Sequence, residues 1–209
     1  MAKLREGANG SYYGSLYTES EPLSQSEMEL NATYLYKALF KSGWTINSIS
    51  AILGNMQAES TINPGRWQSD NVGSTSNGYG LVQWTPSTKY TEWCSTNGLS
   101  DPSEMDNNIS RILYEVANGL QWISTDTYNM SFKEFSISNE PVSSLAKAFL
   151  LCYERPADQS ESVQNYRSKL AEDWYTYLSN GVQPEKKKNK NKYNFIVLNA
   201  RRRREQWIR

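Results

Sequence analysis

Glu59 is the residue of this sequence best placed for acid–base chemistry. It lies three residues after Met56 and seven after Ile52, on the apolar face of a predicted helix and in its last turn. Burial on such a face raises the pKa of a carboxyl group toward the range of a general acid. A solvated glutamate just off the apolar stripe is the simpler interpretation, and periodicity taken alone favours it.

The absence of histidine from all 209 residues excludes several classes of enzyme. Ser-His-Asp triads, Cys-His nucleophile pairs and zinc sites built on histidine all need an imidazole. Cys94 and Cys152 are too few for a four-thiolate zinc site, and no GxxxxGK[ST] loop is present for nucleotide phosphates. We interpret both cysteines as packing residues and expect an enzyme that uses carboxylates, without a metal or other cofactor.

A polar, glycine-rich segment follows Glu59 and supplies further candidates. Residues 65–83 read GRWQSDNVGSTSNGYGLVQ, which predicts a long loop or a small irregular hairpin. A hydrolase ordinarily needs a second carboxylate about 5–9.5 Å from the acid, whereas a transglycosylase or substrate-assisted route needs none. Asp70 is the best candidate for that carboxylate, although a loop aspartate is most often a turn former.

Four aromatic residues near this segment suit stacking on the faces of sugar rings, with packing in the core as the alternative. They are Trp67, Tyr79, Trp84 and Trp93, and for Trp93 we favour core packing.

Helical start signals surround the loop and predict a mainly α-helical body. Ser26 with Glu29 forms one S-x-x-E capping box and Ser131 with Glu134 another, while Asp101 precedes a proline in the first helical position. The predicted helices cover 26–41, 45–60, 101–120, a short stretch from 131, 141–154 and 161–178.

Charge divides the chain into a body and a tail. Residues 185–209 hold ten basic and two acidic side chains, so their net charge is +8 and that of the remaining chain is −8. The acidic body argues against a nucleic-acid partner. We interpret 1–24 as an irregular arm, 25–181 as one domain and 182–209 as a basic extension. That extension is either solvated or an attachment element in which YNFIVL adds a strand to a partner.

Neither a secretory signal nor a membrane-spanning segment is visible, because the chain has no apolar run of the required length. We therefore expect synthesis in the cytoplasm.

Several motifs resemble those of wall-degrading enzymes. ESTINP followed by GYGLVQ resembles the first two motifs of goose-type lysozymes and soluble lytic transglycosylases. WTxxxI, LGNMQAESTINPG, GYGLVQWTP and CYERPA resemble, in the same order, the phage tail lysozyme family, the peptidoglycan-degrading domain of phi29-like tail-knob proteins. The resemblance covers about residues 24–180.

The resemblance implies a lysozyme-like helical fold and a role for each matching residue. Glu59 would protonate the leaving glycosidic oxygen, Ser60 and Gln83 would hydrogen-bond near it, and Tyr153 would take the place of the tyrosine in a third motif. That motif usually reads AYN and here reads CYE, so Glu154 is either a substrate contact or a surface partner of Arg155.

The function implied is cleavage of bacterial peptidoglycan between its alternating amino sugars. The resemblance places the protein in the phage tail with other tail proteins, where it would open the host wall during infection. The alternatives are an endolysin released late in lysis and a non-catalytic module that binds glycan or a partner protein. The motifs leave open whether the enzyme is a hydrolase or a lytic transglycosylase.

Overall fold

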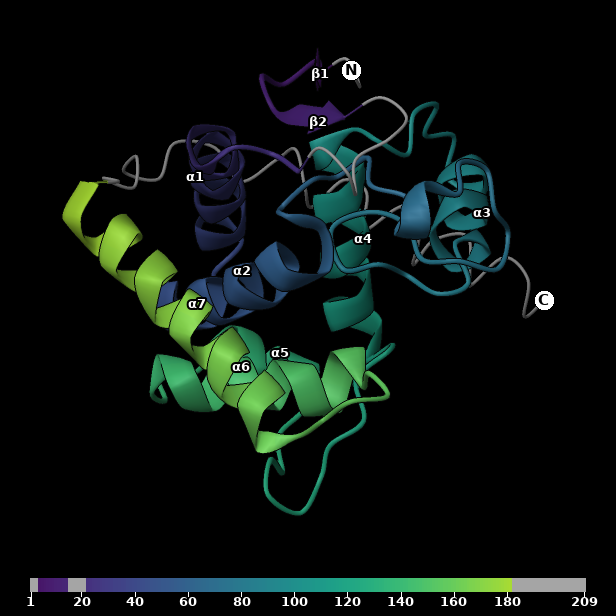
Figure 1. Cartoon of the computed structure of the whole chain (residues 1–209). Coiled ribbons are helices and arrows are strands. Elements are labelled where there is room, and N and C mark those ends of the chain that lie inside the picture. Colours follow the sequence, from purple (N-terminus) through teal and green to yellow (C-terminus); the bar gives the residue numbers. More distant parts are fainter. Residues whose placement is uncertain (1–3, 15–21, 182–209) are drawn as a thin grey trace.

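The computed structural model describes residues 4–14 and 22–181, and the predictions for the basic extension lie outside these residues. The described chain is mainly helical, as predicted (Figure 1). Its strands are β1 (Leu4–Glu6) and β2 (Tyr12–Gly14). Its helices are α1 (Gln25–Lys41), α2 (Ile46–Ser60), α3 (Thr88–Thr96), α4 (Met105–Asn118), α5 (Phe132–Ser136), α6 (Val142–Phe149) and α7 (Glu161–Gly181). A 3₁₀ turn (Gln68–Asp70) and a π-helical turn (Leu150–Glu154) complete them.

Helix α2 forms the centre of the body. Nine consecutive residues, Ser48 to Met56, are buried, and a helix that is buried on all sides must be surrounded by other elements. Helices α1, α6 and α7 pack against it (Figure 1). The helix has Thr45 as its N-cap and ends at Ser60, one residue shorter than the predicted helix over 45–60, so Glu59 lies in the last turn of the most buried helix described.

Gly54 lets α7 cross α2 at close range. A Cβ atom at Gly54 would lie 2.6 Å from the backbone nitrogen of Ala171 and 2.8 Å from its Cα. Real Cβ atoms do not approach backbone so closely, so any side chain here would push α7 away from α2.

Gly54→Ala is therefore expected to destabilise the fold. Helix propensity alone would stabilise the variant by about 1 kcal/mol, but overpacking of a core costs about 1–3 kcal/mol. Because the clash is with backbone atoms that cannot turn aside, we expect a cost near the upper end of that range and a net loss of about 2 kcal/mol in denaturant unfolding. The control is Gly181→Ala at the end of α7, where a Cβ meets nothing within 4 Å. An equal or higher unfolding midpoint for Gly54→Ala would contradict the close crossing.

The predicted N-cap of the first helix is wrong by two residues, because the cap is Ser24 and not Ser26. The capping box uses Ser24 and Glu27: Ser24 Oγ accepts from the Glu27 backbone N–H, and Glu27 Oε2 accepts from that of Ser24. Leu23 before the cap and Met28 in the first turn are both buried in the core, the positions of a hydrophobic staple. Because the box starting at Ser26 lacks this apolar pair, the earlier box forms.

The predicted cap at Asp101 is also wrong. Its carboxylate accepts from the backbone N–H of Ser103 at 2.9 Å and pairs with Arg5 at 2.7 Å, so it closes a turn before the helix. Helix α4 begins four residues later, at Met105, and ends at Asn118. Leu120, at the end of the predicted helix over 101–120, is beyond α4 and exposed.

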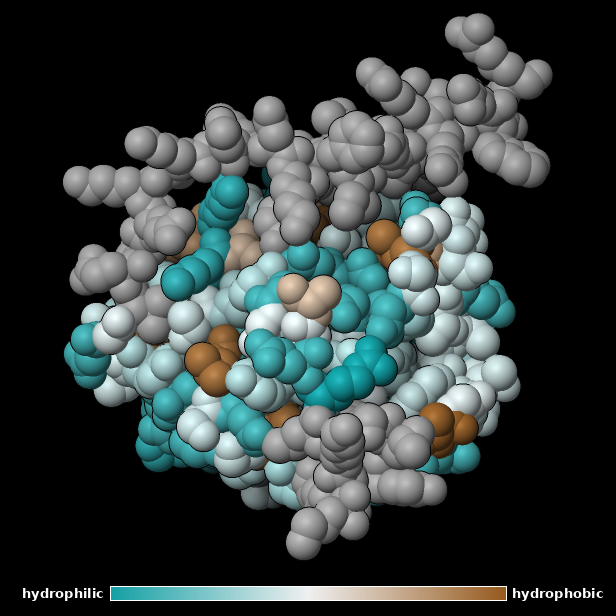
Figure 2. Space-filling model, turned by 90° about the horizontal axis from the view of Figure 1, so that it is seen from above, coloured by the Kyte–Doolittle hydropathy of each residue, from teal (hydrophilic) through white to brown (hydrophobic). Residues whose placement is uncertain are grey.

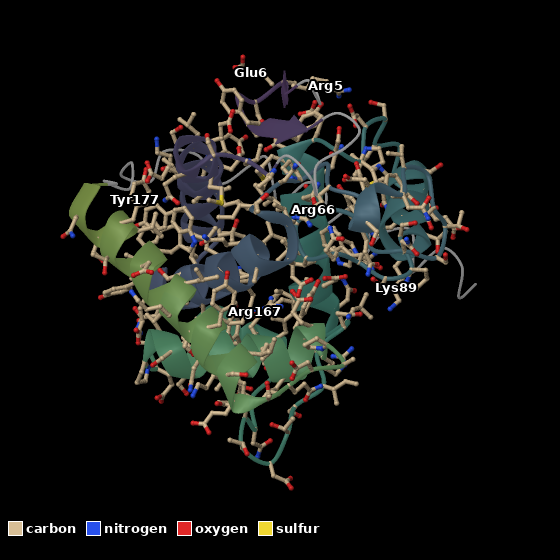
Figure 3. The ribbon with its side chains drawn as sticks, viewed as in Figure 1. Arg5, Glu6, Arg66, Lys89, Arg167 and Tyr177 are labelled. Atoms are coloured by element: carbon tan, nitrogen blue, oxygen red, sulfur yellow. The ribbon has the colours of Figure 1, made fainter. Side chains whose placement is uncertain are left out.

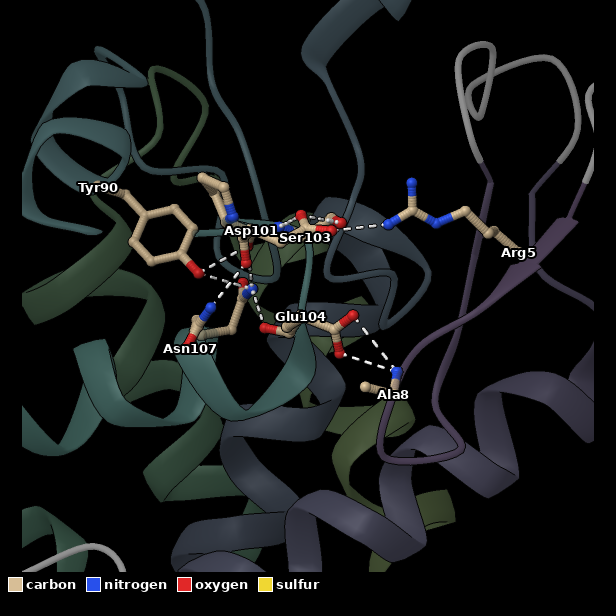
Figure 4. Close-up of polar contacts among 9 residues, drawn as sticks. Arg5, Ala8, Tyr90, Asp101, Ser103, Glu104 and Asn107 are labelled. Atoms are coloured by element: carbon tan, nitrogen blue, oxygen red, sulfur yellow. Dashed lines mark hydrogen bonds and ion pairs between the residues drawn. The ribbon is translucent and has the colours of Figure 1, made fainter. Parts of the chain in front are cut away.

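Residues 4–14 form a β-hairpin, so the prediction of an irregular arm is wrong for this part. Strands β1 and β2 pair antiparallel, with Arg5 opposite Tyr13. The Tyr13 ring is buried beneath Arg5, and the Ala8 N–H donates to Glu104 (Figure 4). Three-residue strands are too short to show alternation in the sequence, and the hairpin depends on these contacts with the chain before α4.

The remaining elements agree more closely with the predictions. The capping box of Ser131 with Glu134 forms as predicted, and α7 covers the predicted helix over 161–178. The predicted helix over 141–154 is α6 followed by the π-helical turn, and α3 was not predicted.

The face viewed from above is mostly hydrophilic, with hydrophobic residues scattered over it (Figure 2). None of the described helices is both long and apolar enough to cross a membrane.

Candidate active site

A cleft of about 540 Å³ opens where the end of α2 meets the glycine-rich loop and the π-helical turn. Figure 3 labels three cations of this region: Arg66 in the loop after α2, Lys89 in α3 and Arg167 in α7. The cleft is lined by Ala58, Glu59, Arg66, Gln68, Val82, Gln83, Trp84, Thr85, Lys89, Gln121, Tyr153, Glu154, Arg155 and Pro156.

Glu59 projects from the last turn of α2 into this cleft. Its side chain is 21% exposed, and its Oε1 accepts a hydrogen bond of 2.6 Å from Arg167 Nη2 in an ion pair. Arg167 also donates to the backbone oxygen of Asn55 at 3.1 Å, so α7 fixes the carboxylate against α2. The close crossing at Gly54 brings Arg167 within reach of Glu59.

Ser60 and Gln83 shape the loop around the cleft. The Ser60 hydroxyl is buried and donates to the Leu81 carbonyl at 2.8 Å, which ties the loop to the end of α2. Gln83 lines the cleft with a φ of 48°, and its amide donates to the Gly80 carbonyl at 2.8 Å. These hydrogen bonds hold the loop, and within the described chain neither side chain hydrogen-bonds to the Glu59 carboxylate.

The aromatic candidates pack mainly against one another. The ring centroids of Trp67 and Tyr79 are 4.2 Å apart, and those of Trp84 and Tyr90 are 4.4 Å apart. Among the sugar-stacking candidates only Trp84 lines the cleft, and it is 3% exposed. Trp93 packs against Tyr90, in line with the packing role favoured from the sequence.

Asp70 is not brought into the cleft. It ends the 3₁₀ turn with a φ of 50°, is partly exposed and is absent from the residues that line the cleft. The carboxyl group that shares the cleft with Glu59 is that of Glu154.

Glu115, on α4, was not identified from the sequence. Its side chain is 1% exposed and accepts hydrogen bonds from Arg111 at 2.8 Å, Trp84 at 3.1 Å and Tyr153 at 2.6 Å. Burial raises its pKa, while Arg111 and the hydrogen bonds oppose part of that rise. Glu115 follows the buried Ile112 by three residues, the same spacing that singled out Glu59, so the sequence did carry a signal.

Tyr153 lines the cleft, but its hydroxyl makes a hydrogen bond within the protein. The side chain is almost fully buried, its ring centroid lies 4.4 Å from that of Phe149, and its hydroxyl donates to Glu115. Burial, followed by the charge of Glu115, raises the pKa of the Tyr153 hydroxyl well above its usual value. This hydrogen bond fixes the π-helical turn, which forms one wall of the cleft, against α4.

Glu154 ends the π-helical turn, and the surface ion pair with Arg155 does not form. Arg155 donates instead to the backbone oxygens of Gln121 and Cys152. The Oε1 atom of Glu154 is enclosed and has no hydrogen-bond partner in the described chain. Burial raises the pKa of Glu154 well above its usual value, and the nearby charge of Glu59 raises it further.

The two cysteines are free and buried, as expected for packing residues. Burial raises the pKa of Cys94 to about 11, so its thiol stays protonated. Within residues 4–14 and 22–181, no three His, Cys, Asp or Glu side chains are grouped so that they could hold a metal ion.

Comparison with known proteins finds a matching family and a similar phage protein. The family described as phage tail lysozyme matches residues 30–178. The chain is also 48% identical over 171 residues to morphogenesis protein 1 of Bacillus phage B103. That match covers 80% of this chain and 45% of the relative, so the chain spans less than half the relative's length.

Proposed function

Because this chain belongs to the phage tail lysozyme family, we propose that it is a glycosidase that cleaves the glycan strands of bacterial peptidoglycan between alternating amino sugars. The observation that supports this most directly is the position of Glu59. Its carboxyl group is partly exposed at the end of a buried helix and lines a cleft with the loop predicted from the sequence. A module that only bound glycan would not need such an acid.

In the proposed reaction, Glu59 carries a proton and donates it to the oxygen of the scissile glycosidic bond. The donation leaves a carboxylate, and Arg167, 2.6 Å away in the structure, stabilises that charge. Arg167 is therefore a positioning residue for Glu59. Because Asp70 does not line the cleft, we propose that the 3₁₀ turn supplies no second carboxylate.

We place the enzyme in the phage tail, where it would open the host wall during infection together with other tail proteins. The family description and the B103 morphogenesis protein support this location over a lysis enzyme. Mass spectrometry of purified particles tests it, because a tail enzyme is present in the particle and an endolysin released at lysis is absent.

Incubation of the protein with purified peptidoglycan is expected to lower turbidity and release glycan fragments. Mass spectrometry of the fragments identifies the route: a reducing end with water added means hydrolysis, and a 1,6-anhydro end means transglycosylation. Intact walls after incubation, with the protein bound to them, would contradict the glycosidase and favour a glycan-binding module.

A further inference from the structure

Glu154 combines two features that are costly together for a charged group. It ends the π-helical turn in the wall of the cleft, and its Oε1 atom is enclosed without a hydrogen-bond partner. Removing a charged oxygen from water without a compensating donor is expensive, whereas a neutral carboxylic acid carries its own proton. The geometry therefore favours the uncharged form of Glu154.

The charged groups around Glu154 act in the same direction. Burial is the main cause that raises the pKa of Glu154, and the charges of Glu59 from α2 and Glu115 from α4 raise it further because both repel another negative charge. Two cations oppose them, but each has other partners. Arg167 from α7 pairs with Glu59, and Arg155 donates to two backbone oxygens.

Three glutamines that line the cleft hydrogen-bond to backbone groups of the protein. Gln68 accepts from the Gly78 N–H, Gln83 donates to the Gly80 carbonyl, and Gln121 donates to the Tyr153 carbonyl. A glycan presents hydroxyl and acetamido oxygens that need donors. Glu154 differs from these glutamines because no described residue hydrogen-bonds to its carboxyl group. Its Oε1 is enclosed, so the oxygen that this half-buried side chain offers to a ligand in the cleft is Oε2.

We propose that Glu154 acts as a neutral carboxylic acid that donates a hydrogen bond to an oxygen of the bound glycan, and not as a second catalytic carboxylate. The identity of this ligand rests on the proposed function. With Glu154 acting only as a hydrogen-bond donor and Asp70 outside the cleft, Glu59 is left as the only catalytic carboxyl among the residues that line the described cleft. The reaction then follows a route that needs no second carboxylate.

The first test measures stability and needs no glycan. In the unfolded chain Glu154 ionises near pH 4.5, while in the folded chain it keeps its proton to higher pH. Its contribution to stability is therefore fully present below pH 4.5 and is lost as the pH rises through the raised folded value. Glu154→Gln cannot ionise, so at pH 8 its Tm is expected to exceed that of the wild type by about 2–4 °C or more.

Glu172→Gln is the matched control, since Glu172 is an exposed glutamate on α7. Its stability should follow that of the wild type at every pH. If the Tm of Glu154→Gln also changes with pH in parallel with that of the wild type from pH 4 to pH 9, Glu154 is ionised in the folded protein. The proposal is then overturned.

The second test measures binding of an N-acetylglucosamine tetramer by calorimetry. Glu154→Leu, which has no donor, is expected to bind about tenfold more weakly than the wild type, and Glu154→Gln to lose no more than about threefold. Wild-type affinity should fall at high pH, and that of Glu154→Gln should not. Wild-type affinity in Glu154→Leu would overturn the glycan contact.

A catalytic carboxylate would behave differently in cleavage of peptidoglycan. Glu154→Gln would then lose several orders of magnitude in kcat, as an amide can neither attack nor accept a proton, and the proposal would fail. Failure of the proposed function gives a different result: the wild-type protein then leaves peptidoglycan uncut. The stability test needs no substrate and still reports whether Glu154 is ionised.

Discussion

Glu59→Gln is expected to slow cleavage of peptidoglycan by about 10²–10⁴-fold, the usual contribution of a general acid. Glutamine has the shape of glutamate and offers Arg167 an oxygen at the same place, but it has no proton to give to the glycosidic oxygen. The loss should appear in kcat, measured by release of soluble fragments from purified walls, with little change in KM.

Two controls separate lost chemistry from lost structure. Glu59→Gln should unfold at a midpoint close to that of the wild type, because α2 is held by its buried face. Glu172→Gln, on the exposed face of α7, should keep wild-type activity. A Glu59→Gln protein that still cleaves walls at the wild-type rate would remove Glu59 from the mechanism.

Glu115→Ala is expected to destabilise the protein by about 3–5 kcal/mol, the usual result when one partner of a buried ion pair is removed. The substitution leaves Arg111, the Trp84 indole and the Tyr153 hydroxyl without their common acceptor. Urea unfolding followed by tryptophan fluorescence measures the loss.

The chain contains a matched ion pair on its surface. Lys169 and Asp173 have the same i,i+4 spacing on α7 as Arg111 and Glu115 on α4, but both are exposed. Asp173→Ala should leave the unfolding midpoint unchanged, since solvent already screens that pair. Similar midpoints for Asp173→Ala and Glu115→Ala would contradict a structural role for the buried carboxylate.

The sequence predicted those parts of the fold and site that depend on local patterns. Apolar periodicity identified α2 and put Glu59 in its last turn, and glycine and asparagine marked the loop that carries Gln83. Both depend on neighbours within a few residues. The choice between the boxes at Ser24 and Ser26 also depends on local residues, because Leu23 and Met28 flank the first box at the positions of a hydrophobic staple and the prediction did not use that pair.

The predictions failed where distant segments meet. Glu115 is important because Trp84 and Tyr153, more than 30 residues away on either side, donate to it. The short strands of the hairpin are stabilised by Asp101 and Glu104. The surface pair expected for Glu154 fails because the chain turns at Arg155, with a φ of 50°. Spacing in the sequence carries no information about such contacts.

The π-helical turn lets one wall of the cleft absorb a change in chain length. A π turn holds one residue more than an α-helical turn in nearly the same rotation, so deletion of one residue ahead of Tyr153 within Leu150–Glu154 would convert it to an α-helical turn. The side chains after the deletion would keep their directions, and Glu154 would stay in the cleft. A regular helix such as α2 has no extra residue to lose, so a deletion ahead of Glu59 would rotate that side chain by about 100°. Alignment gaps among functional relatives are thus expected in the exposed loop over 71–76 and in this turn, but not in α2.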